Sequence, residues 1–364
     1  MFNVKSLFTI TLTLFAAALF AACGGAQPQG WSSPTLDNGL LFFGTTNAKV
    51  AALDAASGNM KWEYAGEKDK PLVSVYSTPI VSNGKLFFGA YDGIFYALDP
   101  ATGTVKWQFN EGSPIVPSAS VNDGTVYFGA NNNSFYAVDA ETGTKKWQFA
   151  TQDKVWSDAA LDNGTLYFGS LDQNLYAVDA ATGAKKWAFP AGGMIVTTPL
   201  VLNGTVYFGA LNKFFALDQA TSQVKWTKTL SDSNEWIWSD PTTQNGNIYF
   251  GTLAGNVYAI DAATGSDKWA QPYKAGGQIR SSIIPAGNVG YFGSSNQNVY
   301  AIDLDSAQLK WNPVALQGPI LGSPLVVGDT LYVPTHGSNM YALNTADGSR
   351  KWCFDANSNK ACSQ

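Results

Sequence analysis

The residues best suited to binding chemistry stand at the starts of a repeated unit in the sequence. Each unit opens with a short stretch related to aromatic-Ser-x-Pro, which is expected to form the innermost strand of its sheet, and this column varies more than the rest of the repeat. Aromatic rings can stack against a ligand, and carboxylate or guanidinium groups can pair with its charges. The column therefore predicts either a binding funnel or side chains that plug a central channel. The candidate funnel residues are Trp31, Tyr76, Trp156, Asp158, Trp238, Asp240 and Arg280.

Residues for catalysis and for metal binding are scarce. The single histidine, His336, leaves little room for Ser-His-Asp or Cys-His catalysis and excludes a His-rich metal site. The sequence contains no G-x-x-x-x-G-K-[ST] loop and no EF-hand pattern. We therefore predict no catalytic residues, no metal ligands and no cofactor. An enzyme is conceivable only if a cofactor carries the chemistry.

The elements that position the funnel residues come from a repeat of about forty residues. The stretch DAATGAKKW at residues 179–187 recurs eight times with small changes. Asp179 and Thr182 can accept hydrogen bonds from the backbone of a tight turn, and Gly183 can supply its positive φ. Because a catalytic aspartate would not normally occur eight times, these residues are predicted to be structural. The tryptophan that ends each copy is predicted to cover the neighbouring unit: Trp62, Trp107, Trp147, Trp187, Trp226, Trp269, Trp311 and Trp352.

Each unit is predicted to contain four short antiparallel strands. Hydrophobic runs such as residues 165–169 and 175–179 alternate with turns, and no helical period appears after the leader. Asn-Gly or Asp-Gly pairs, the strongest short hairpin signal, close the first hairpin of six units. Ser222 and Ala307 replace the turn glycine in two units, and Val333-Pro334 replaces Phe-Gly in the last. We predict an all-β chain folded as an eight-bladed β-propeller of four-stranded antiparallel blades.

The first 30 residues are predicted to direct the chain to a membrane surface. Residues 1–22 are predicted to be a signal peptide, because Lys5 precedes an apolar run of 16 residues that is short for a spanning helix. The run ends Phe20-Ala21-Ala22-Cys23, which resembles a lipobox, so Cys23 is predicted to be lipidated and residues 23–30 to form a tether. The alternatives are an ordinary cleaved signal and an uncleaved anchor. The expected location is the cell envelope, either the outer membrane facing the periplasm or the cell surface.

The rest of the chain, residues 31–364, is predicted to be one propeller domain with a short C-terminal tail. With Cys23 lipidated, two cysteines remain, Cys353 and Cys362. In an exported protein such a pair indicates a disulfide, here joining the tail to the last blade. Two free thiols or a metal site are the alternative, although the spacing is not typical of metal ligands.

Partners are constrained by charge and by two long connectors. Charged residues make up 13% of the chain and the formal net charge is −5, which argues against nucleic acid and against electrostatic docking on anionic lipid. The connectors at residues 66–75 and 228–237 are longer and more polar than the others, and Trp236 in the second is a candidate protein contact. The expected partners are membrane lipid, through acylated Cys23, and a protein of the envelope. The propeller itself is expected to be monomeric.

The repeat A-x-D-x-x-T-G-x-x-x-W behind a lipoprotein leader resembles the quinoprotein-type (PQQ-like) repeat propellers. The size and leader are most similar to the outer-membrane-assembly lipoproteins among them, which implies a non-catalytic scaffold that presents loops to a partner. The dehydrogenase branch of the family implies pyrroloquinoline quinone, calcium, a catalytic aspartate and often a disulfide between adjacent cysteines. This chain has no adjacent cysteines and lacks the long insertions of those enzymes. The expected function is a membrane-anchored protein-interaction scaffold; the alternatives are a small-ligand-binding propeller and a PQQ-dependent dehydrogenase.

Overall fold

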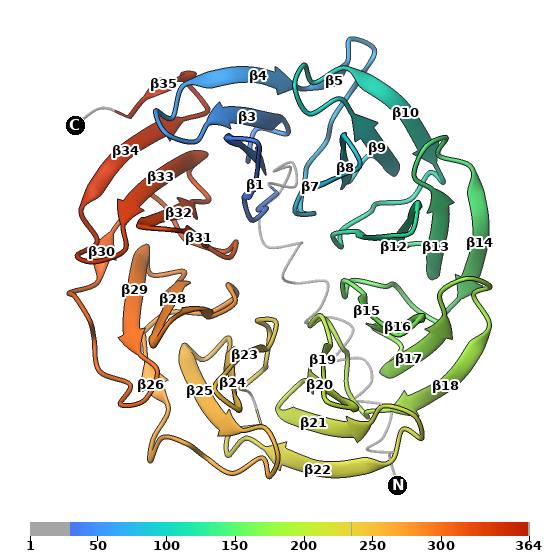
Figure 1. The fold of residues 1–364 in the computed structure, drawn as a ribbon, viewed down its shortest axis with the longest axis vertical. Coiled ribbons are helices and arrows are strands. Elements are labelled where there is room, and N and C mark those ends of the chain that lie inside the picture. Colours follow the sequence, from blue (N-terminus) through green and yellow to red (C-terminus); the bar gives the residue numbers. More distant parts are fainter. Residues whose placement is uncertain (1–29, 234, 363–364) are drawn as a thin grey trace, which may run out of the picture.

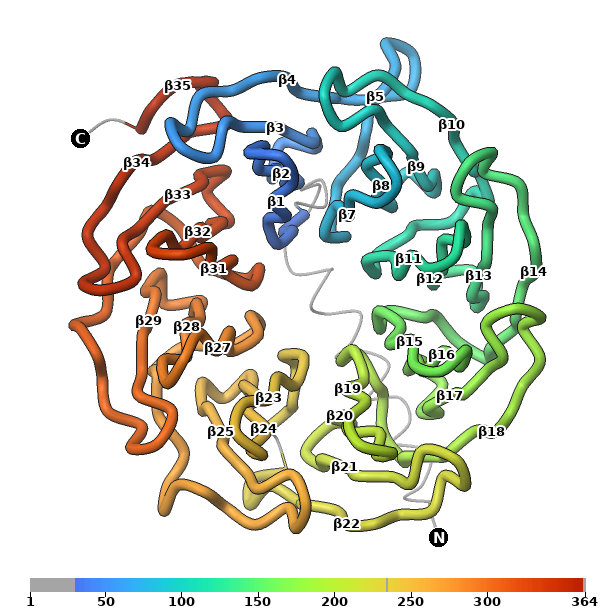
Figure 2. The backbone as a smooth tube through the Cα atoms, in the orientation of Figure 1, coloured from blue at the N-terminus to red at the C-terminus, as the bar shows by residue number. Residues whose placement is uncertain are grey.

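Eight antiparallel sheets stand around a central opening in the computed structural model, which describes residues 30–233 and 235–362 (Figure 1). The strands of each blade run outward from the centre in chain order (Figure 2). The predicted all-β, eight-bladed propeller is confirmed. Among the described residues no helix is long and apolar enough to cross a membrane, and the leader with Cys23 lies outside them.

The first four blades are built from consecutive strands of three to six residues. Blades 1 and 2 contain β1 (Thr35–Asp37), β2 (Leu40–Gly44), β3 (Val50–Asp54), β4 (Met60–Tyr64), β7 (Ile80–Ser82), β8 (Lys85–Gly89), β9 (Ile94–Leu98) and β10 (Val105–Asn110). Blades 3 and 4 contain β11 (Ser120–Asn122), β12 (Thr125–Ala130), β13 (Ser134–Asp139), β14 (Lys145–Ala150), β15 (Ala160–Asp162), β16 (Thr165–Gly169), β17 (Asn174–Asp179) and β18 (Lys185–Pro190). A small hairpin, β5 (Gly66–Glu67) with β6 (Lys70–Pro71), projects between blades 1 and 2 (Figure 1).

The last four blades follow the same order with two irregularities. Blades 5 and 6 contain β19 (Leu200–Leu202), β20 (Thr205–Ala210), β21 (Lys213–Asp218), β22 (Val224–Thr229), β23 (Thr242–Gln244), β24 (Asn247–Gly251), β25 (Asn256–Asp261) and β26 (Tyr273–Lys274). Blades 7 and 8 contain β27 (Ile284–Ala286), β28 (Val289–Gly293), β29 (Asn298–Asp303), β30 (Val314–Ala315), β31 (Leu325–Val327), β32 (Thr330–Pro334), β33 (Asn339–Asn344), β34 (Arg350–Asp355) and β35 (Lys360–Ala361). The outer strands β26 and β30 are short, and β35 adds a fifth strand to blade 8.

The turns that carry the repeated aspartate have the predicted conformation. Asp179 Oδ1 accepts hydrogen bonds from Thr182 N at 3.0 Å and Thr182 Oγ1 at 2.9 Å, and Gly183 has a φ of 72°. Ser222 and Ala307 keep a positive φ of 58° at the equivalent position, so the turn survives loss of the glycine. The aspartates are therefore engaged in local turn bonds, as the sequence predicts.

The tryptophan that ends each repeat joins its blade to the next one. In every blade the indole Nε1 donates a hydrogen bond of 3.0–3.2 Å to a backbone oxygen in the following turn. Trp352 of blade 8 donates to the oxygen of Ala55 in blade 1 at 3.1 Å, which closes the ring. In the part of the chain that the structure describes, blades 1 and 8 each come from one continuous segment. This closure therefore uses side-chain contacts such as the Trp352 bond and exchanges no strand.

Close approach between blades also depends on a glycine at or next to the end of the second strand of each of the first seven blades. A Cβ at Gly89 would lie 2.2 Å from Cγ2 of Ile115, which leads into the next blade, and equivalent contacts occur at the seams from blade 1/2 to blade 7/8. At the seam between blades 8 and 1, the large and the small residue exchange places. Pro334 stands in place of that glycine, and Gly30 stands where the other seams have valine or isoleucine.

Gly89→Ala is expected to lower the free energy of unfolding by at least about 1 kcal/mol, because the added methyl must displace Ile115. Urea unfolding measures the change. The loss caused by Gly89→Ala should be smaller in an Ile115→Ala background, which lacks the Cγ2 atom, whereas equal stability of Gly89→Ala and the wild type would contradict the packing described here.

Candidate binding site at the mouth of the ring

The stretches that open each repeat lead into the innermost strands and do not form them. β1 begins at Thr35, directly after Pro34, and β7 begins at Ile80, directly after Pro79. Proline has no backbone N–H to donate to a strand ladder, so the strand starts one residue later. The expectation that Trp31 and its equivalents lie within the innermost strands was therefore wrong. These residues lie on the connectors that enter those strands, at one mouth of the ring.

Four aromatic side chains and one arginine form a continuous contact series across the mouth, here called the aromatic arc: Tyr91, Tyr76, Trp31, Arg280 and Trp238. Ring centroids lie 5.7 Å apart for Tyr91 and Tyr76, and 4.7 Å apart with edge-on geometry for Tyr76 and Trp31. The Arg280 guanidinium carbon lies 5.4 Å from the Trp31 ring and 4.8 Å from the Trp238 ring. All five side chains are half-buried. The structure thus brings together four of the predicted funnel residues and adds Tyr91, which the sequence did not single out.

Arg280 has unusual surroundings for a cation. Its Nη2 donates to Gln278 Oε1 at 3.4 Å, while Nε is buried without a hydrogen-bond partner. Burial lowers the pKa of Arg280 below its usual value, and within residues 30–233 and 235–362 no carboxylate opposes that shift. Two indole faces provide the guanidinium with cation–π contacts in place of a counterion.

Trp156 stands apart from the aromatic arc. Its indole Nε1 donates to Oδ1 of Asn131, in the loop between β12 and β13, at 2.7 Å. This bond fixes the half-buried ring between blades 3 and 4. The predicted aromatic funnel residues therefore divide into three members of the arc and Trp156, which is bonded to Asn131.

Asp158 and Asp240 belong to a set of residues that link one blade to the next around the channel. Asp158 Oδ1 accepts a hydrogen bond from Ser118 N at 2.6 Å, and Asp240 Oδ1 accepts one from Thr198 N at 2.6 Å. Hydroxyl groups make the same link elsewhere, as where Ser323 N donates to Ser33 Oγ at 2.8 Å. The two carboxylates, predicted as funnel residues, thus act as inter-blade acceptors.

The two carboxylates also influence each other. Burial and repulsion from Asp240 raise the pKa of Asp158 to about 7. Burial likewise raises the pKa of Asp240, against the opposing hydrogen bond from Thr198. A carboxyl group whose folded-state pKa is raised stabilises the fold at low pH, and this contribution is lost as pH rises through the folded-state pKa.

Wild-type stability is therefore expected to fall between about pH 4 and pH 7, and Asp158→Asn should flatten this profile. The amide oxygen can still accept the Ser118 N–H bond, while the repulsion from Asp240 disappears. Above pH 7 the variant should be more stable by at least about 1 kcal/mol, since one pKa unit corresponds to 1.36 kcal/mol. Thermal melts from pH 4 to pH 8 measure the difference, and parallel profiles for the two proteins would contradict the raised pKa.

The connector that carries Trp236 is tied to blade 6 by a buried carboxylate. Glu235, 3% exposed, accepts hydrogen bonds from Thr252 Oγ1 at 2.9 Å, Asn256 Nδ2 at 2.6 Å and Tyr258 OH at 2.9 Å. Trp236 itself is half-buried, and the connector begins beyond β22, so residues 228 and 229 are not part of it. Partner contact through Trp236 stays a prediction.

Sequence reasoning missed Glu235, although a signal was present. In blade 4 the loop residue Asp172 accepts the hydrogen bond of Tyr176 OH at 2.7 Å. Blade 6 has Ala254 at that loop position, so Tyr258 needs an acceptor from elsewhere. A missing loop carboxylate next to a long connector containing a glutamate indicates such a replacement.

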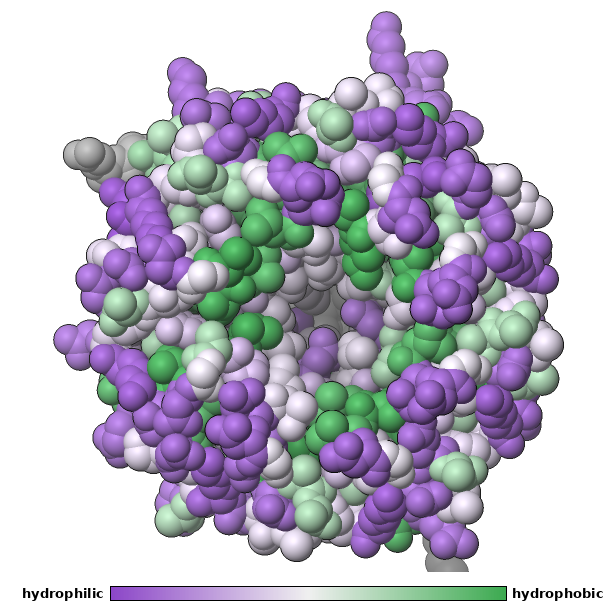
Figure 3. Space-filling model, in the orientation of Figure 1, coloured by the Kyte–Doolittle hydropathy of each residue, from purple (hydrophilic) through white to green (hydrophobic). Residues whose placement is uncertain are grey.

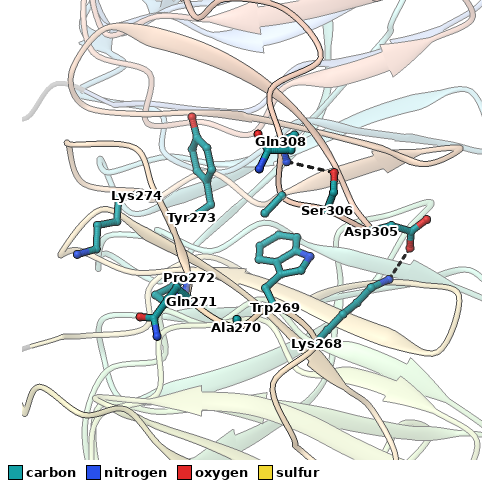
Figure 4. A pocket seen from close by; sticks show the side chains of 11 residues that line it. Lys268, Trp269, Ala270, Gln271, Pro272, Tyr273, Lys274, Asp305, Ser306 and Gln308 are labelled. Carbon is teal, nitrogen blue, oxygen red and sulfur yellow. Dashed lines mark hydrogen bonds and ion pairs between the residues drawn. The ribbon is translucent and has the colours of Figure 1, made fainter.

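A second hollow, of about 440 Å³, lies on the outer rim between blades 6 and 7 (Figure 4). Pro272 and Pro313 interrupt the outer strands there, because proline removes a ladder hydrogen bond. Trp269, only 7% exposed, packs into the blade contact, and Lys268 and Asp305 form an ion pair of 2.7 Å at one edge. The rim hollow thus follows from two shortened strands and includes none of the predicted site residues.

The mouth does not fit the quinone and calcium of the dehydrogenase branch. The structure joins Cys353 and Cys362 in a disulfide with Cα atoms 5.4 Å apart, at the outer edge of blade 8 and away from the mouth. Asp158 and Asp240 already accept backbone N–H groups, and their raised pKa values favour the protonated form, which is a poor ligand for calcium. No catalytic step is therefore assigned to a quinone here.

Comparison with known proteins gives one family match and several structural neighbours. A family model described as outer membrane protein assembly factor BamB matches residues 21–148, 131–311 and 276–363. BamB from Moraxella catarrhalis has a TM-score of 0.70 and 19% identity, over 85% of this chain and 93% of that one. No curated protein matches this sequence.

Two further solved structures show how widely this architecture is shared. The computationally designed Ika8 protein has a TM-score of 0.67 and 15% identity, over 77% of this chain and 86% of that one. Quinohemoprotein alcohol dehydrogenase ADHIIG from Pseudomonas putida HK5 has a TM-score of 0.67 and 18% identity, over 87% of this chain and 70% of that one. At such identities the similarity shows the fold alone.

Proposed function

This chain belongs to the outer membrane protein assembly factor BamB family of PQQ-like repeat propellers, and from that premise we propose that it is a lipid-anchored, non-catalytic protein-interaction scaffold of the cell envelope. The observation that carries the proposal is the aromatic arc, which four blades build at the mouth. Tryptophan, tyrosine and arginine are the residue types enriched at the energetic centres of protein interfaces. A role in outer membrane protein assembly, as in the name of the matched family, is the specific form of this function that we propose.

Two features of the ring support binding over catalysis. The carboxylates of Asp158 and Asp240 hold neighbouring blades together, and the repeated turn aspartates accept hydrogen bonds from their own turns. These groups are thus engaged in maintaining the ring. The half-buried aromatic arc, by contrast, presents rings at the opening. Figure 3 shows that hydrophobic residues of other types also gather around the hollow centre of the face in view, while hydrophilic residues lie on the rim.

Partner capture tests the proposal. The full acylated chain, retained on native membranes and cross-linked before solubilisation, should recover a stable protein partner. A variant with both Trp31→Ala and Trp238→Ala should lose most of that recovery, whereas the rim variant Val224→Ala should retain it, since Val224 is 48% exposed on an outer strand. Recovery of no partner by the wild type would contradict the scaffold function.

Membrane anchoring is tested separately, because Cys23 lies outside the described residues. Cys23→Ala should shift the protein from the membrane fraction to the soluble fraction of the envelope, and mass spectrometry of the wild type should show acyl chains on Cys23. Retention of the variant on the membrane would remove the lipid anchor from the proposal and leave the scaffold function intact.

The dehydrogenase alternative has its own assay, motivated by the structural similarity to quinohemoprotein alcohol dehydrogenase. Purified protein supplied with pyrroloquinoline quinone and calcium should fail to reduce an electron-accepting dye with alcohols or sugars. Dye reduction above the rate of a heat-denatured control would contradict the non-catalytic function.

A further inference from the structure

Arg280 is a cation that the mouth surrounds with aromatic faces and leaves without a negative partner. Among the described residues no carboxylate pairs with it, and its Nε is buried without a hydrogen-bond acceptor. A partly desolvated charge is costly when it has neither a counterion nor full hydrogen bonding. The surrounding rings offset only part of that cost, so the positive charge of Arg280 is only partly compensated within the chain.

The positions of Trp31 and Trp238 determine how an anion can approach the guanidinium. The two indoles lie 5.4 Å and 4.8 Å from the guanidinium carbon, and they come from blades 1 and 6 on either side of the arginine in blade 7. A group that reaches Arg280 therefore passes between apolar ring surfaces. A carboxylate attached to an apolar chain matches this arrangement, because its charge meets the guanidinium while its neighbours meet the rings.

The arc is longer than a small anion requires. From Trp238 and Arg280 it continues through Trp31 to Tyr76 and Tyr91, and so reaches blade 2. Each of these five side chains is half-buried, so each keeps part of its surface available. An extended peptide can cover such a surface, whereas a free carboxylate would contact only the part next to Arg280.

Building on the scaffold function proposed above, we propose that the aromatic arc binds an acidic segment of a protein partner. One carboxylate of the segment pairs with the guanidinium of Arg280, and apolar side chains next to it lie against Trp31 and Trp238. The interaction completes the hydrogen bonding of Arg280, and it weakens with added salt as a solvent-accessible ion pair does. In the predicted partner segment, acidic side chains therefore alternate with apolar ones.

The test uses nuclear magnetic resonance, because the sequence has only two arginines, Arg280 and Arg350. Their side-chain Nε–H signals report separately on the mouth and on the exposed outer strand β34. The probes are a doubly blocked peptide of alternating leucine and glutamate, the same peptide with glutamine, and free glutarate. The glutamate peptide should shift the Arg280 signal, leave the Arg350 signal unchanged, and bind at least tenfold more tightly than the other two.

Matched variants separate binding from folding. Arg280→Gln should remove the preference for the glutamate peptide without lowering the melting temperature, because it removes a cation that lacks a counterion. Arg350→Gln should keep both the preference and the melting temperature. A fall in the melting temperature of Arg280→Gln together with full glutamate preference would show a structural role in place of a binding one.

Three results with these probes would overturn the inference. The first is equal binding of the glutamate and glutamine peptides to the wild type. The second is an Arg280 signal that responds to neither peptide. The third is binding of glutarate as tight as that of the glutamate peptide. The last result would identify a small-carboxylate site. Capture of an envelope partner that is equal for the wild type and Arg280→Gln also overturns it, while the scaffold function stands. Failure to capture any partner contradicts the scaffold function directly.

Discussion

Replacing Trp147 with alanine is expected to lower the free energy of unfolding by about 3 kcal/mol or more. The indole donates Nε1 to the oxygen of Ala180 in the next blade at 3.0 Å. It also lies against Tyr127 and Phe135, with ring centroids 5.9 Å and 6.2 Å away. Truncation removes an apolar contact and an inter-blade hydrogen bond together, so urea unfolding should show a clear loss of stability.

Trp156→Ala is the matched control, because it removes the same side chain from the mouth. The hydrogen bond from its indole to Asn131 is worth about 1 kcal/mol. The loss of stability in Trp147→Ala should therefore be at least twice that in Trp156→Ala. Equal losses in the two variants would contradict the assignment of the repeated tryptophans as inter-blade anchors.

Removing the disulfide with Cys353→Ser and Cys362→Ser is expected to cost about 2 to 3 kcal/mol, as the loop-closure entropy for a ring of this size predicts. The bond holds β35 against β34 through the pairs Phe354–Ala361 and Asp355–Lys360, next to the seam between blades 8 and 1. The tail thus reinforces the one seam at which the two ends of the propeller meet.

A reductant provides the control for this prediction. It should lower the melting temperature of the wild type to that of the double variant and leave the variant unchanged. If the reductant has no effect on the wild type, the two cysteines are free thiols in the purified protein and the tail is held by strand pairing alone.

The features that the sequence predicted well are those decided by near neighbours in the chain. Asp179 and Gly183 belong to one turn, so residue type alone specifies the hydrogen bonds and the backbone angle. The spacing of the tryptophans specifies the number of blades, because each indole contacts the turn of the next repeat. Even the replacements Ser222 and Ala307 left the turn unchanged.

The site was predicted less completely, because its contacts join residues that are far apart in the sequence. Trp31 and Arg280 meet only when the ring closes, and nothing in either repeat alone indicates that contact. Asp158 and Asp240 looked like ligand-binding groups, yet the structure shows each accepting a hydrogen bond from the preceding blade. Their bonding depends on a backbone N–H that the sequence pattern does not specify.

The central claim is that partners bind at the mouth of the ring, and site-directed photo-cross-linking in the native envelope tests it most directly. A photo-reactive phenylalanine analogue in place of Tyr91 lies at the end of the aromatic arc, and the same analogue in place of Val224 lies on the rim. We expect a discrete protein adduct from position 91 and none from position 224. An adduct from position 224 with none from position 91 would contradict binding at the mouth.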